Sequence, residues 1–305
     1  ELSGVFALGL RKLLGIAEHR AIEAVRKDHG CDDYRSRERP APGLIDTRRP
    51  RNTPQPSRSH LASVYPLSRY NAGMFTRTAA FYDAVYSFKD YVGEAERLED
   101  IVRERLPNAR TLLDVGCGTG MHLLVLKRLF DAEALDLDPN MVALAAQRNP
   151  EAKVHVADMA EFELGKTFDV VTCLFSSVGY TITEERLDAA IACMAHHTNR
   201  GGLVIVEPWI FPEQFKDHHL GSLFVDHDDL KIARIHISKR EGDRSIIEFN
   251  YLVGRTTGIE HLIERHEMGL FTDAQYRKAF ARAGLNLDWD AEGLMGRGMY
   301  IGTRP

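Results

Sequence analysis

The sequence T-L-L-D-V-G-C-G-T-G (residues 111–120) joins an apolar strand to a loop with glycine at every second position. The strand ends at Asp114, and the loop glycines are Gly116, Gly118 and Gly120. Glycine lets the backbone turn sharply and lets a ligand lie against the main chain, because no side chain intervenes. A dinucleotide fingerprint, G-x-G-x-x-G, requires glycine at position 121, which is Met121. The spacing is instead D-x-G-x-G-x-G, so the loop differs from that fingerprint.

Polar residues also stand at the predicted ends of the next three strands. The second strand presents Asp136, 22 residues after Asp114, and an acidic residue at about that distance hydrogen-bonds ribose hydroxyls in dinucleotide folds. The third strand ends at Asp158 and Met159, which we expect to bind the adenine amino group and to lie on the ring. The fourth strand runs into Ser176 and Ser177. These strand ends predict one crevice at the edge of a sheet; the alternative is that the aspartates are ordinary turn carboxylates.

The length of 305 residues favours one large domain, either alone or with appendages. Hydrophobic residues make up 44% of the chain, and no stretch approaches the roughly 20 apolar residues that span a bilayer. The four cysteines form no C-x-x-C pair, so we expect reduced thiols and a cytoplasmic location. The histidines lack the spacing of metal ligands and the body has no basic stripe. We therefore expect no metal, no membrane and no nucleic acid as partners.

Residues 1–70 differ from the rest of the chain. They contain 13 Lys and Arg against 8 Asp and Glu, and six of the twelve prolines lie between Pro40 and Pro66. A Pro/Arg-rich run of this kind lacks the pattern of a packed core, so we expect a basic, disordered N-terminal extension. Residues 2–27 have the pattern of a short basic helix, and contact of this helix with a membrane or a nucleic acid stays open as an alternative.

Residues 71–213 and 272–305 are predicted to form the core domain. Helical spacing of apolar residues from Val92 to Leu106 indicates a helix, and short strands then alternate with helices up to Glu207. This alternation is typical of a mostly parallel sheet that is covered by helices on both faces, the α/β class. The final helix and the last two strands are predicted over 272–283, 285–289 and 299–302.

Residues 214–271 are predicted to form an inserted antiparallel β subdomain. The stretches 231–239 and 245–253 alternate with a period of two residues, and the turn E-G-D-R at 241–244 joins them as a hairpin. In the first stretch, Ile235 and Ile237 lie on one face and Arg234 and His236 on the other. A third strand is predicted over 259–270. Insertions after strand ends commonly determine substrate specificity.

The glycine loop and its acidic partner resemble the nucleoside-binding site of class I S-adenosylmethionine (SAM) methyltransferases. Over residues 72–303 the chain is similar, more narrowly, to the dTDP-aminosugar N-methyltransferases, including the dTDP-desosamine and dTDP-mycaminose N,N-dimethyltransferases. The motifs are A-F-Y-D, K-D-Y, L-L-D-V-x-C-G-T-G-M-H, C-L-F-S-S-V-G-Y, V-I-V-E-P-W-x-F-P-E, R-E-G, L-F-T and G-R-G-M-Y-I-G. The resemblance implies a Rossmann-like class I methyltransferase fold and SAM as the cofactor.

The resemblance also implies roles for individual residues around SAM. Tyr82 and Tyr91 match tyrosines that approach the methionyl carboxylate, Asp136 matches the ribose ligand, and Asp158 with Met159 matches the adenine site. The residues that we assign to the cofactor are Tyr82, Tyr91, Asp114, Gly116, Cys117, Gly118, Gly120, Asp136, Leu137, Asp158, Met159 and Leu174. SAM carries a sulfonium cation and no phosphate, so the glycine loop serves close approach rather than anion binding.

The methyl acceptor is expected beside this cofactor. Tyr180 is the candidate to hydrogen-bond an amine or to accept its proton, although a phenol with a pKa of about 10 is a poor base unless perturbed, and simple packing is the alternative. Trp209 is expected to wall the pocket or merely to close the crevice. Arg297, between two glycines, is expected to contact an anion such as diphosphate or to form a surface salt bridge. The remaining acceptor candidates are Ser176, Ser177 and Ser238.

These features predict a SAM-dependent methyltransferase that N-methylates a nucleotide-activated aminosugar or a similar small amine. An amine only has to lose its proton and meet the methyl carbon in line, so positioning and desolvation supply most of the acceleration. One alternative is O- or N-methylation of another small metabolite, with His122 or His155 near the acceptor in the case of oxygen. Another alternative is a catalytically inactive SAM-binding interaction protein. The exposed antiparallel sheet predicts a homodimer.

Overall fold

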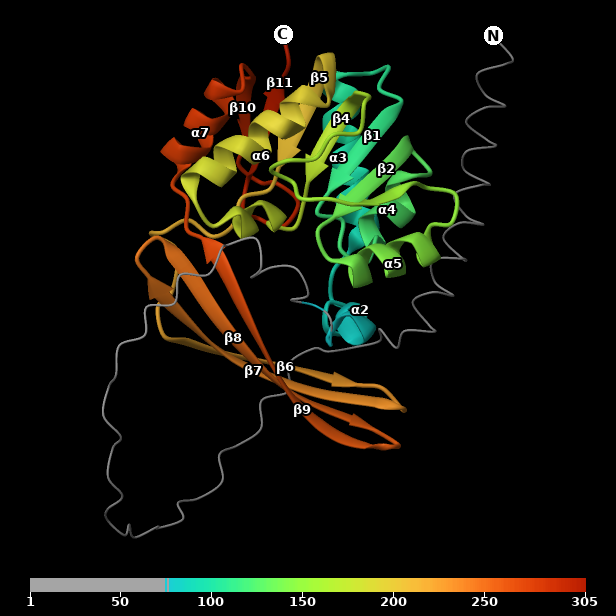
Figure 1. Cartoon of the computed structure of the whole chain (residues 1–305), viewed down its shortest axis with the longest axis vertical. Coiled ribbons are helices and arrows are strands. Elements are labelled where there is room, and N and C mark those ends of the chain that lie inside the picture. Colours follow the sequence, from blue (N-terminus) through green and yellow to red (C-terminus); the bar gives the residue numbers. More distant parts are fainter. Residues whose placement is uncertain (1–74, 76) are drawn as a thin grey trace. The chain divides into compact units, whose positions relative to one another are not determined.

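The computed structural model describes Phe75 and residues 77–305 of the chain (Figure 1). The N-terminal extension that the sequence predicts over residues 1–70 lies outside this described part. The described part of the chain forms one mostly parallel sheet with helices and one separate antiparallel sheet.

The larger sheet has seven strands in the order β10-β11-β5-β4-β1-β2-β3. The strands are β1 (Thr111–Val115), β2 (Asp131–Asp136), β3 (Val154–Val156), β4 (Phe168–Cys173), β5 (Thr198–Val206), β10 (Asn286–Asp290) and β11 (Met299–Thr303). Strands β1 to β5 pair in parallel, whereas β11 pairs antiparallel with β5 and β10. The chain order reverses between β1 and β4, and ligands of such sheets bind beyond the carboxyl ends at that point. The predicted α/β class is confirmed.

Helices lie against both faces of this sheet, and α6 and α7 share one face (Figure 1). The helices are α3 (Tyr91–Arg105), α4 (Met121–Leu126), α5 (Pro139–Arg148), α6 (Glu184–His196) and α7 (Asp273–Arg282). Successive residues of a strand point to opposite faces, so Leu112 joins the core cluster that contains Leu98 of α3. Its neighbour Leu113 joins the cluster that contains Leu187 of α6. Full burial of such a side chain stabilises the fold by about 1.5–3 kcal/mol.

Four of these helices begin at a side chain that caps their free N–H groups. Asp90 accepts a hydrogen bond from Gly93 N, and Asp138 accepts one from Asn140 N. Thr183 and Thr272 cap α6 and α7 in the same way. Each cap satisfies a backbone donor that has no partner within the helix and contributes about 1 kcal/mol.

The second sheet has four antiparallel strands in the order β6-β7-β8-β9. The strands are β6 (His219–Asp226), β7 (Leu230–Glu241), β8 (Arg244–Arg255) and β9 (Gly258–Gly269). The hairpin between β7 and β8 is confirmed, with Gly242 at a φ of +62° in its turn. The prediction of three strands is wrong, because β6 was missed. In β6 the apolar residues Leu223, Phe224 and Val225 are consecutive, which hides the period of two.

The inner face of strand β7 buries polar residues beside apolar ones such as Ile232, which is 2% exposed. Arg234 is only 8% exposed, whereas its neighbour Ile235 is 48% exposed. The register pairs Arg234 with Tyr251 and His236 with Phe249, so these polar residues share a face with buried aromatic residues of β8. The alternation in the sequence is confirmed, but the polar face is the inner one.

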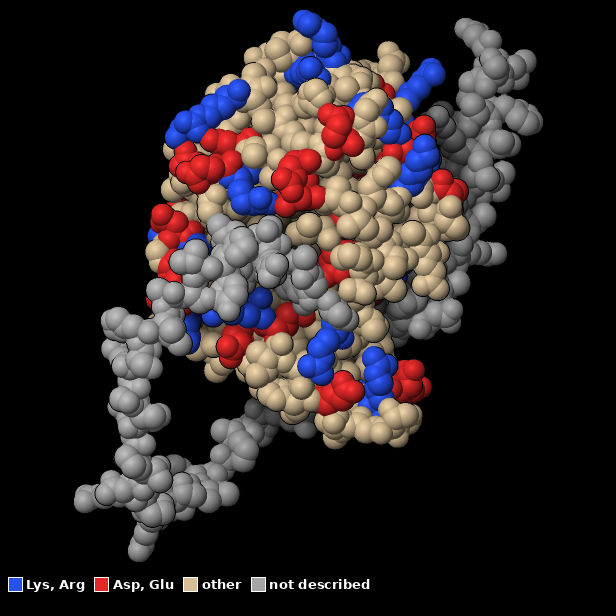
Figure 2. Space-filling model, in the orientation of Figure 1, with Lys and Arg blue, Asp and Glu red and all other residues tan. Residues whose placement is uncertain are grey.

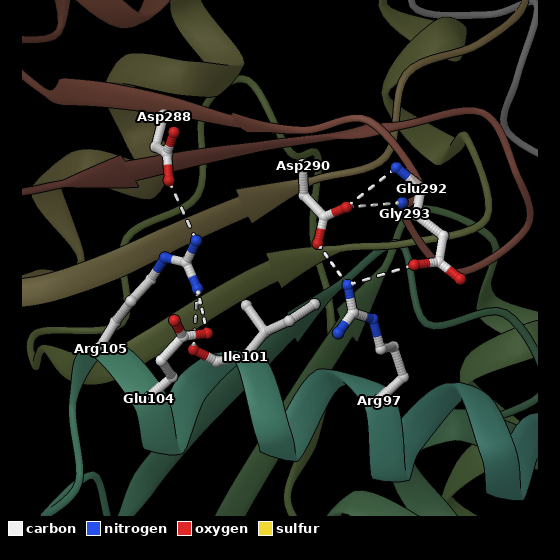
Figure 3. A network of polar contacts seen from close by, with 8 residues as sticks. All are labelled: Arg97, Ile101, Glu104, Arg105, Asp288, Asp290, Glu292 and Gly293. Atoms are coloured by element: carbon white, nitrogen blue, oxygen red, sulfur yellow. Dashed lines mark hydrogen bonds and ion pairs between the residues drawn. The ribbon is translucent and has the colours of Figure 1, made fainter.

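Ion pairs between α3 and the edge strand β10 lie beside a loop that is important for the site (Figure 3). The pairs are Arg97–Asp290 at 2.8 Å and Arg105–Asp288 at 3.0 Å. Asp290 also accepts hydrogen bonds from the backbone N–H groups of Glu292 and Gly293. Exposed ion pairs contribute little to stability, about 0–1 kcal/mol each. These ion pairs instead hold the start of the loop 291–298 in place against α3.

The surface of the described part carries mixed charge. On the face that Figure 2 shows, Lys and Arg side chains are interspersed with Asp and Glu side chains. The described residues of this face therefore present no continuous basic band for a nucleic-acid backbone. None of the helices between residues 77 and 305 combines the length and the apolar character that a bilayer span requires.

Candidate active site

A cavity of about 420 Å³ lies between the carboxyl ends of β1, β2 and β4 and the inner face of the antiparallel sheet. This volume is within the range of small-molecule sites. The predicted site residues that line it are Tyr82, Tyr91, Asp114, Gly116, Cys117, Gly118, Asp136, Leu137, Asp158, Met159, Leu174, Ser177, Tyr180, Trp209 and Arg297. Three predicted residues, Gly120, Ser176 and Ser238, are not part of the lining.

The glycine loop exposes its main chain to the cavity. Gly116 has a φ of +74°, and a Cβ atom at this position would lie 2.8 Å from the Ser177 Cβ. Gly118 has a φ of +56°, and its Cβ position is open to the cavity, with no atom within 4 Å. A side chain at either position would be strained. Gly120 instead caps the start of α4 and packs against Ala145 of α5, so it shapes the loop without lining the cavity.

Asp136 organises the backbone at this edge of the sheet. Its Oδ2 accepts a hydrogen bond from Gly118 N at 2.8 Å, and its Oδ1 accepts one from Asp138 N at 2.9 Å. Cys117 N donates to the carbonyl of Leu135 at 3.0 Å and closes the same turn. Burial raises the pKa of Asp136, and the two N–H donors oppose this rise. The carboxylate is thus held at the cavity edge by groups of the main chain.

Asp114 provides a test of whether the site suits the cofactor that the resemblance implies. Its Oδ1 accepts a hydrogen bond from the Thr172 hydroxyl at 3.0 Å, while its Oδ2 is buried and has no partner among the described residues. Burial raises the pKa of this carboxyl group. A buried carboxylate oxygen without a donor is costly, so a cationic or N–H-bearing ligand is the natural complement. SAM is cationic at sulfur and carries an ammonium group, and the site fits it.

The side chains predicted to hold adenine lie on the third strand end, but one of them has a partner that the sequence did not reveal. Arg186 of α6 binds both carboxylate oxygens of Asp158, at 2.6 and 2.8 Å. Asp158 Oδ1 also accepts a hydrogen bond from Ala160 N at 2.9 Å. Met159 and Leu174 line the cavity nearby and offer apolar surface. The adenine role of Asp158 stays a prediction, and Arg186 is an additional cavity residue.

Two tyrosines enter the cavity from the helices at the start of the described chain. Tyr82 is the first residue of α2 (Tyr82–Val85), and its ring packs on Tyr86 at 4.5 Å. Tyr91 is the first residue of α3, and its ring meets that of His122 at 4.9 Å. Burial raises the pKa of both phenols. Both therefore stay protonated at neutral pH and can donate hydrogen bonds to an anion.

The segment that leads into α2 makes hydrogen bonds on two sides of the cavity. Phe75 N donates to the carboxylate of Asp138 at 3.2 Å, at the start of α5. The hydroxyl of Thr78 donates to Glu264 on β9. The segment from Phe75 to Phe88 therefore connects the cofactor loops with the antiparallel sheet.

A sharp turn follows strand β4. Phe175 and Ser176 have φ angles of +50° and +63°, which residues other than glycine rarely adopt. Phe175 N donates to Glu207 Oε2 at 2.7 Å and holds this turn. The Ser176 hydroxyl donates to the Pro208 carbonyl at 2.7 Å and accepts a hydrogen bond from Arg297 at 2.8 Å. Ser176 is buried behind the cavity wall, so it positions Arg297 rather than contacting a ligand.

Trp209 and Arg297 form one wall of the cavity. The Arg297 guanidinium lies over the Trp209 ring at 5.3 Å, and the indole N–H donates to Ser245 at 3.0 Å. Ser238, a further residue predicted for the acceptor, does not line the cavity. Its hydroxyl is buried, away from the cavity, and faces the carbonyl groups of Lys216 and His219 at 3.4 Å.

The opposite wall comes from the antiparallel sheet and was missed in the sequence. It contains Arg234, His236, Phe249 and His266. The Tyr180 hydroxyl hydrogen-bonds His266 Nδ1 at 2.6 Å, so Tyr180 joins this wall. The sequence carried one signal, Arg234 and His236 alternating with the isoleucines of this strand. Only the strand register shows that this polar face points into the cavity.

Comparison with known proteins gives a consistent result. A family model described as a methyltransferase domain matches residues 112–202. A dTDP-3-amino-3,6-dideoxy-alpha-D-glucopyranose N,N-dimethyltransferase from Streptomyces fradiae is 43% identical over 228 residues, which cover 73% of this chain and 89% of the relative. The crystal structure of Streptomyces venezuelae DesVI has a TM-score of 0.72 and 41% identity, over 74% of this chain and 98% of that one. The structure of SAM-bound CalS10 from Micromonospora echinaspora, an amino pentose methyltransferase, has a TM-score of 0.68 and 36% identity. The match covers 81% of this chain and 100% of that one.

Replacement of Asp136 by alanine is expected to weaken SAM binding by about 1.5–3 kcal/mol, the usual cost of losing hydrogen bonds to a charged group. Calorimetry on the folded variant measures this change. Because burial raises the pKa of Asp136, its carboxylate protonates at a higher pH than that of a free aspartate. As the pH is lowered, the affinity of the wild type for SAM should therefore begin to fall at a higher pH than the pKa of a free aspartate would suggest.

The matched control is Asp131→Ala, at the exposed start of the same strand β2. This variant should bind SAM like the wild type. If Asp136→Ala folds and binds SAM with unchanged affinity, another residue holds the cofactor.

Proposed function

This chain belongs to the dTDP-aminosugar N,N-dimethyltransferases, a family of SAM-dependent methyltransferases, and we propose that it methylates the amino group of a nucleotide-activated aminosugar. One observation carries the proposal: a single cavity meets the nucleoside-type loop on one side and a wall with arginine and aromatic side chains on the other. A nucleotide sugar has the anionic diphosphate and the rings that complement such a wall.

SAM supplies a methyl group that is activated on a sulfonium ion. Asp136 is assigned to the ribose hydroxyls, and the unpartnered oxygen of Asp114 to the cationic part of the cofactor. Tyr82 and Tyr91 are assigned to the methionyl carboxylate, because their protonated phenols can donate to it. The apolar side chains assigned to the adenine ring are Leu137, Met159 and Leu174.

Two arginines that have no carboxylate partner among the described residues support an anionic acceptor. The partners of Arg297 are the Ser176 hydroxyl and the Trp209 ring, both uncharged. Arg234 lies over the rings of Phe249 and Tyr86, and its buried Nε has no hydrogen-bond partner among the described residues. A guanidinium in such surroundings has unused donors. A diphosphate would accept charge-assisted hydrogen bonds from Arg297.

Methyl transfer to an amine requires orientation more than strong base catalysis. The amine has to present its lone pair in line with the methyl carbon, in a site that excludes water. Tyr180 lines the cavity and is assigned to the amine, either as a hydrogen-bond partner or as the first acceptor of its proton.

Two parts of the chain would bind the two substrates. Residues 71–213 and 272–305 would form the core domain that holds SAM, and residues 214–271 the inserted subdomain that faces the acceptor. The wall residues Arg234, Phe249 and His266 on β7, β8 and β9 support this division.

A cytoplasmic location is part of the same proposal. The cysteines of the described chain, Cys117, Cys173 and Cys193, are free thiols. Free thiols suit a reducing compartment.

Incubation with SAM and a panel of amines tests the proposed function. The panel contains dTDP-aminosugars and phosphate-free amines, and mass spectrometry of the products detects added methyl groups. We expect transfer of two methyl groups to one nitrogen of a sugar nucleotide. Transfer restricted to the phosphate-free amines would contradict the proposal and favour another small metabolite.

Replacement of Arg297 by alanine is expected to raise the KM for the sugar nucleotide while SAM affinity changes little. The physical reason is the loss of a charge-assisted hydrogen bond, worth about 1.5–3 kcal/mol, which corresponds to roughly a 10- to 150-fold change. Steady-state kinetics in which both substrates are varied measure the KM for the sugar nucleotide and the KM for SAM. Arg265→Ala, on the outer face of β9, serves as the control and should behave like the wild type. Normal kinetics in a folded Arg297→Ala variant would remove the reason to invoke diphosphate here.

A homodimer through the outer face of the antiparallel sheet is also part of the proposal. This face exposes a set of large apolar side chains, including Leu220 and Phe224, each 70% exposed, and Leu252, 52% exposed. The register places Phe224, Ala233 and Leu252 side by side across three strands. Exposed apolar patches of this kind usually mark an interface. Lys231 and Glu248 on the same face carry opposite charges, which suits contact with a second copy.

Light scattering at micromolar concentration should give twice the mass of one chain. Phe224→Glu places a charge in the centre of the apolar face, so we expect this variant to be monomeric. Val156→Glu, at an exposed position of β3, is the control and should stay dimeric. A monomeric wild type would contradict the proposed dimer.

A further inference from the structure

Three side chains form a continuous hydrogen-bonded chain that begins in the acceptor wall. The Tyr180 hydroxyl hydrogen-bonds His266 Nδ1 at 2.6 Å, and His266 Nε2 hydrogen-bonds Glu264 Oε1 at 2.5 Å. The second carboxylate oxygen, Oε2, accepts a hydrogen bond from the Thr78 hydroxyl. Because a carboxylate only accepts, Glu264 selects the histidine tautomer with hydrogen on Nε2. His266 Nδ1 is then left as the acceptor for the Tyr180 hydroxyl.

The chain is buried except at its tyrosine end. His266 is 4% exposed and Glu264 is 7% exposed. The Phe75 ring packs edge-on against Tyr180 and His266, at 6.4 and 5.3 Å, and the Phe249 ring packs against His266 at 5.0 Å. Tyr180 and His266 line the cavity, whereas Glu264 does not. A buried carboxylate is costly unless it has partners, and these hydrogen bonds supply them.

We propose that Tyr180, His266 and Glu264 form a relay that takes the proton from the ammonium group of the methyl acceptor. Tyr180 contacts the nitrogen, and His266 and Glu264 act through Tyr180 as positioning residues. This inference rests on the proposed function, because it requires an amine in the acceptor space.

The proton balance of the relay is simple. The N–H bond of the ammonium group breaks and its proton binds the Tyr180 oxygen, while the tyrosine's own proton moves to His266 Nδ1. The imidazolium that forms is stabilised by the Glu264 carboxylate. The lone pair released on nitrogen forms the new C–N bond, and the electron pair of the broken C–S bond stays on sulfur. His266 returns its proton to solvent when the products leave.

The relay would remove the proton that keeps the amine of the substrate from reacting. An alkylammonium group titrates at about 8–10, so most of the amine is protonated at neutral pH and has no lone pair. Tyr180 alone is a poor base, because burial raises its pKa far above that of a free phenol. In the relay, Tyr180 gives its own proton to His266 while it accepts the proton of the amine. Tyr180 therefore does not become a buried phenolate.

The charged and titratable groups around Tyr180 come from several other elements. Burial raises the pKa of Tyr180 most, and Tyr86 directly after α2, Glu264 of β9, Tyr251 of β8 and Asp136 of β2 raise it further. Tyr82 of α2 also interacts with it. Arg234 of β7 lies over Phe249, the ring that packs on His266. The described surroundings thus contain several acidic or phenolic groups, with the Arg234 guanidinium beside them.

The experiment compares Tyr180→Phe, Glu264→Gln and His266→Asn in the full chain, with SAM and a dTDP-aminosugar. We expect each variant to lose about 100-fold in kcat at neutral pH, the usual size of a general acid–base contribution. The deficit should shrink as the pH rises through the pKa of the amine, since the free amine then forms without help. The double variant Tyr180→Phe/His266→Asn should be no slower than either single variant, because both break the same chain.

Two further measurements separate the relay from a structural role. Calorimetry should show unchanged SAM affinity in all three variants. Proton NMR of the wild type should show a low-field resonance from the short His266–Glu264 hydrogen bond, which Glu264→Gln removes and Tyr180→Phe keeps. His261→Asn, at an exposed position of the same strand β9, is the matched control and should leave rate, pH profile and resonance unchanged.

The relay is overturned if a folded Tyr180→Phe variant keeps the wild-type rate, or if the deficit of the variants is the same at every pH. Tyr180→Phe keeps the ring and removes only the hydroxyl, so it tests the relay even if Glu264→Gln or His266→Asn fails to fold. The absence of the low-field resonance in the wild type also counts against the relay. A wild type that methylates phosphate-free amines alone contradicts the proposed function, and the pH profiles with those amines still test the relay.

Discussion

The hydrogen bond from Gly118 N to the Asp136 carboxylate is the interaction on which the geometry of the site depends. It joins the loop after β1 to the end of β2, two neighbouring parallel strands. Two similar bonds join β1 to β4, from Thr172 to Asp114 and from Ser177 to the Gly116 carbonyl. Neighbouring strands are only about 4.8 Å apart, so short polar side chains can span from one strand end to the next. The loop that receives the cofactor is therefore held by the sheet itself rather than by the ligand.

The antiparallel sheet contributes something different, a wall with polar groups buried among aromatic rings. Arg234 lies 4.7 Å from the centre of the Phe249 ring, a contact that offsets part of the cost of removing a guanidinium from water. Ile235 of β7 points the other way, toward the outer face, and is 48% exposed. Both faces of this sheet are thus suited to contacts beyond the fold of one chain, with a small molecule on the inner face and with protein on the outer face.

The sequence was most informative where function follows from position along the chain. Asp114, Asp136, Asp158 and Ser177 could be placed together because the carboxyl ends of parallel strands share one edge. The antiparallel wall was less predictable. A period of two shows which residues share a face, but it does not show which face is buried, and that depends on packing between distant segments. For this reason Arg234 and His266 were missed, and Ser238 was expected at the cavity although its hydroxyl faces backbone carbonyls.

The segment from Phe75 to Phe88 has a consequence for the order of events during repeated turnover. Its hydrogen bonds reach Asp138 beside the cofactor loops and Glu264 in the antiparallel sheet. A shift of Phe75 and residues 77–88 would break both bonds and open the two halves of the cavity together. Spent cofactor would then leave through the same opening that exposes the acceptor. Retention of the acceptor would depend on its own contacts with the antiparallel sheet and with the loop that carries Arg297.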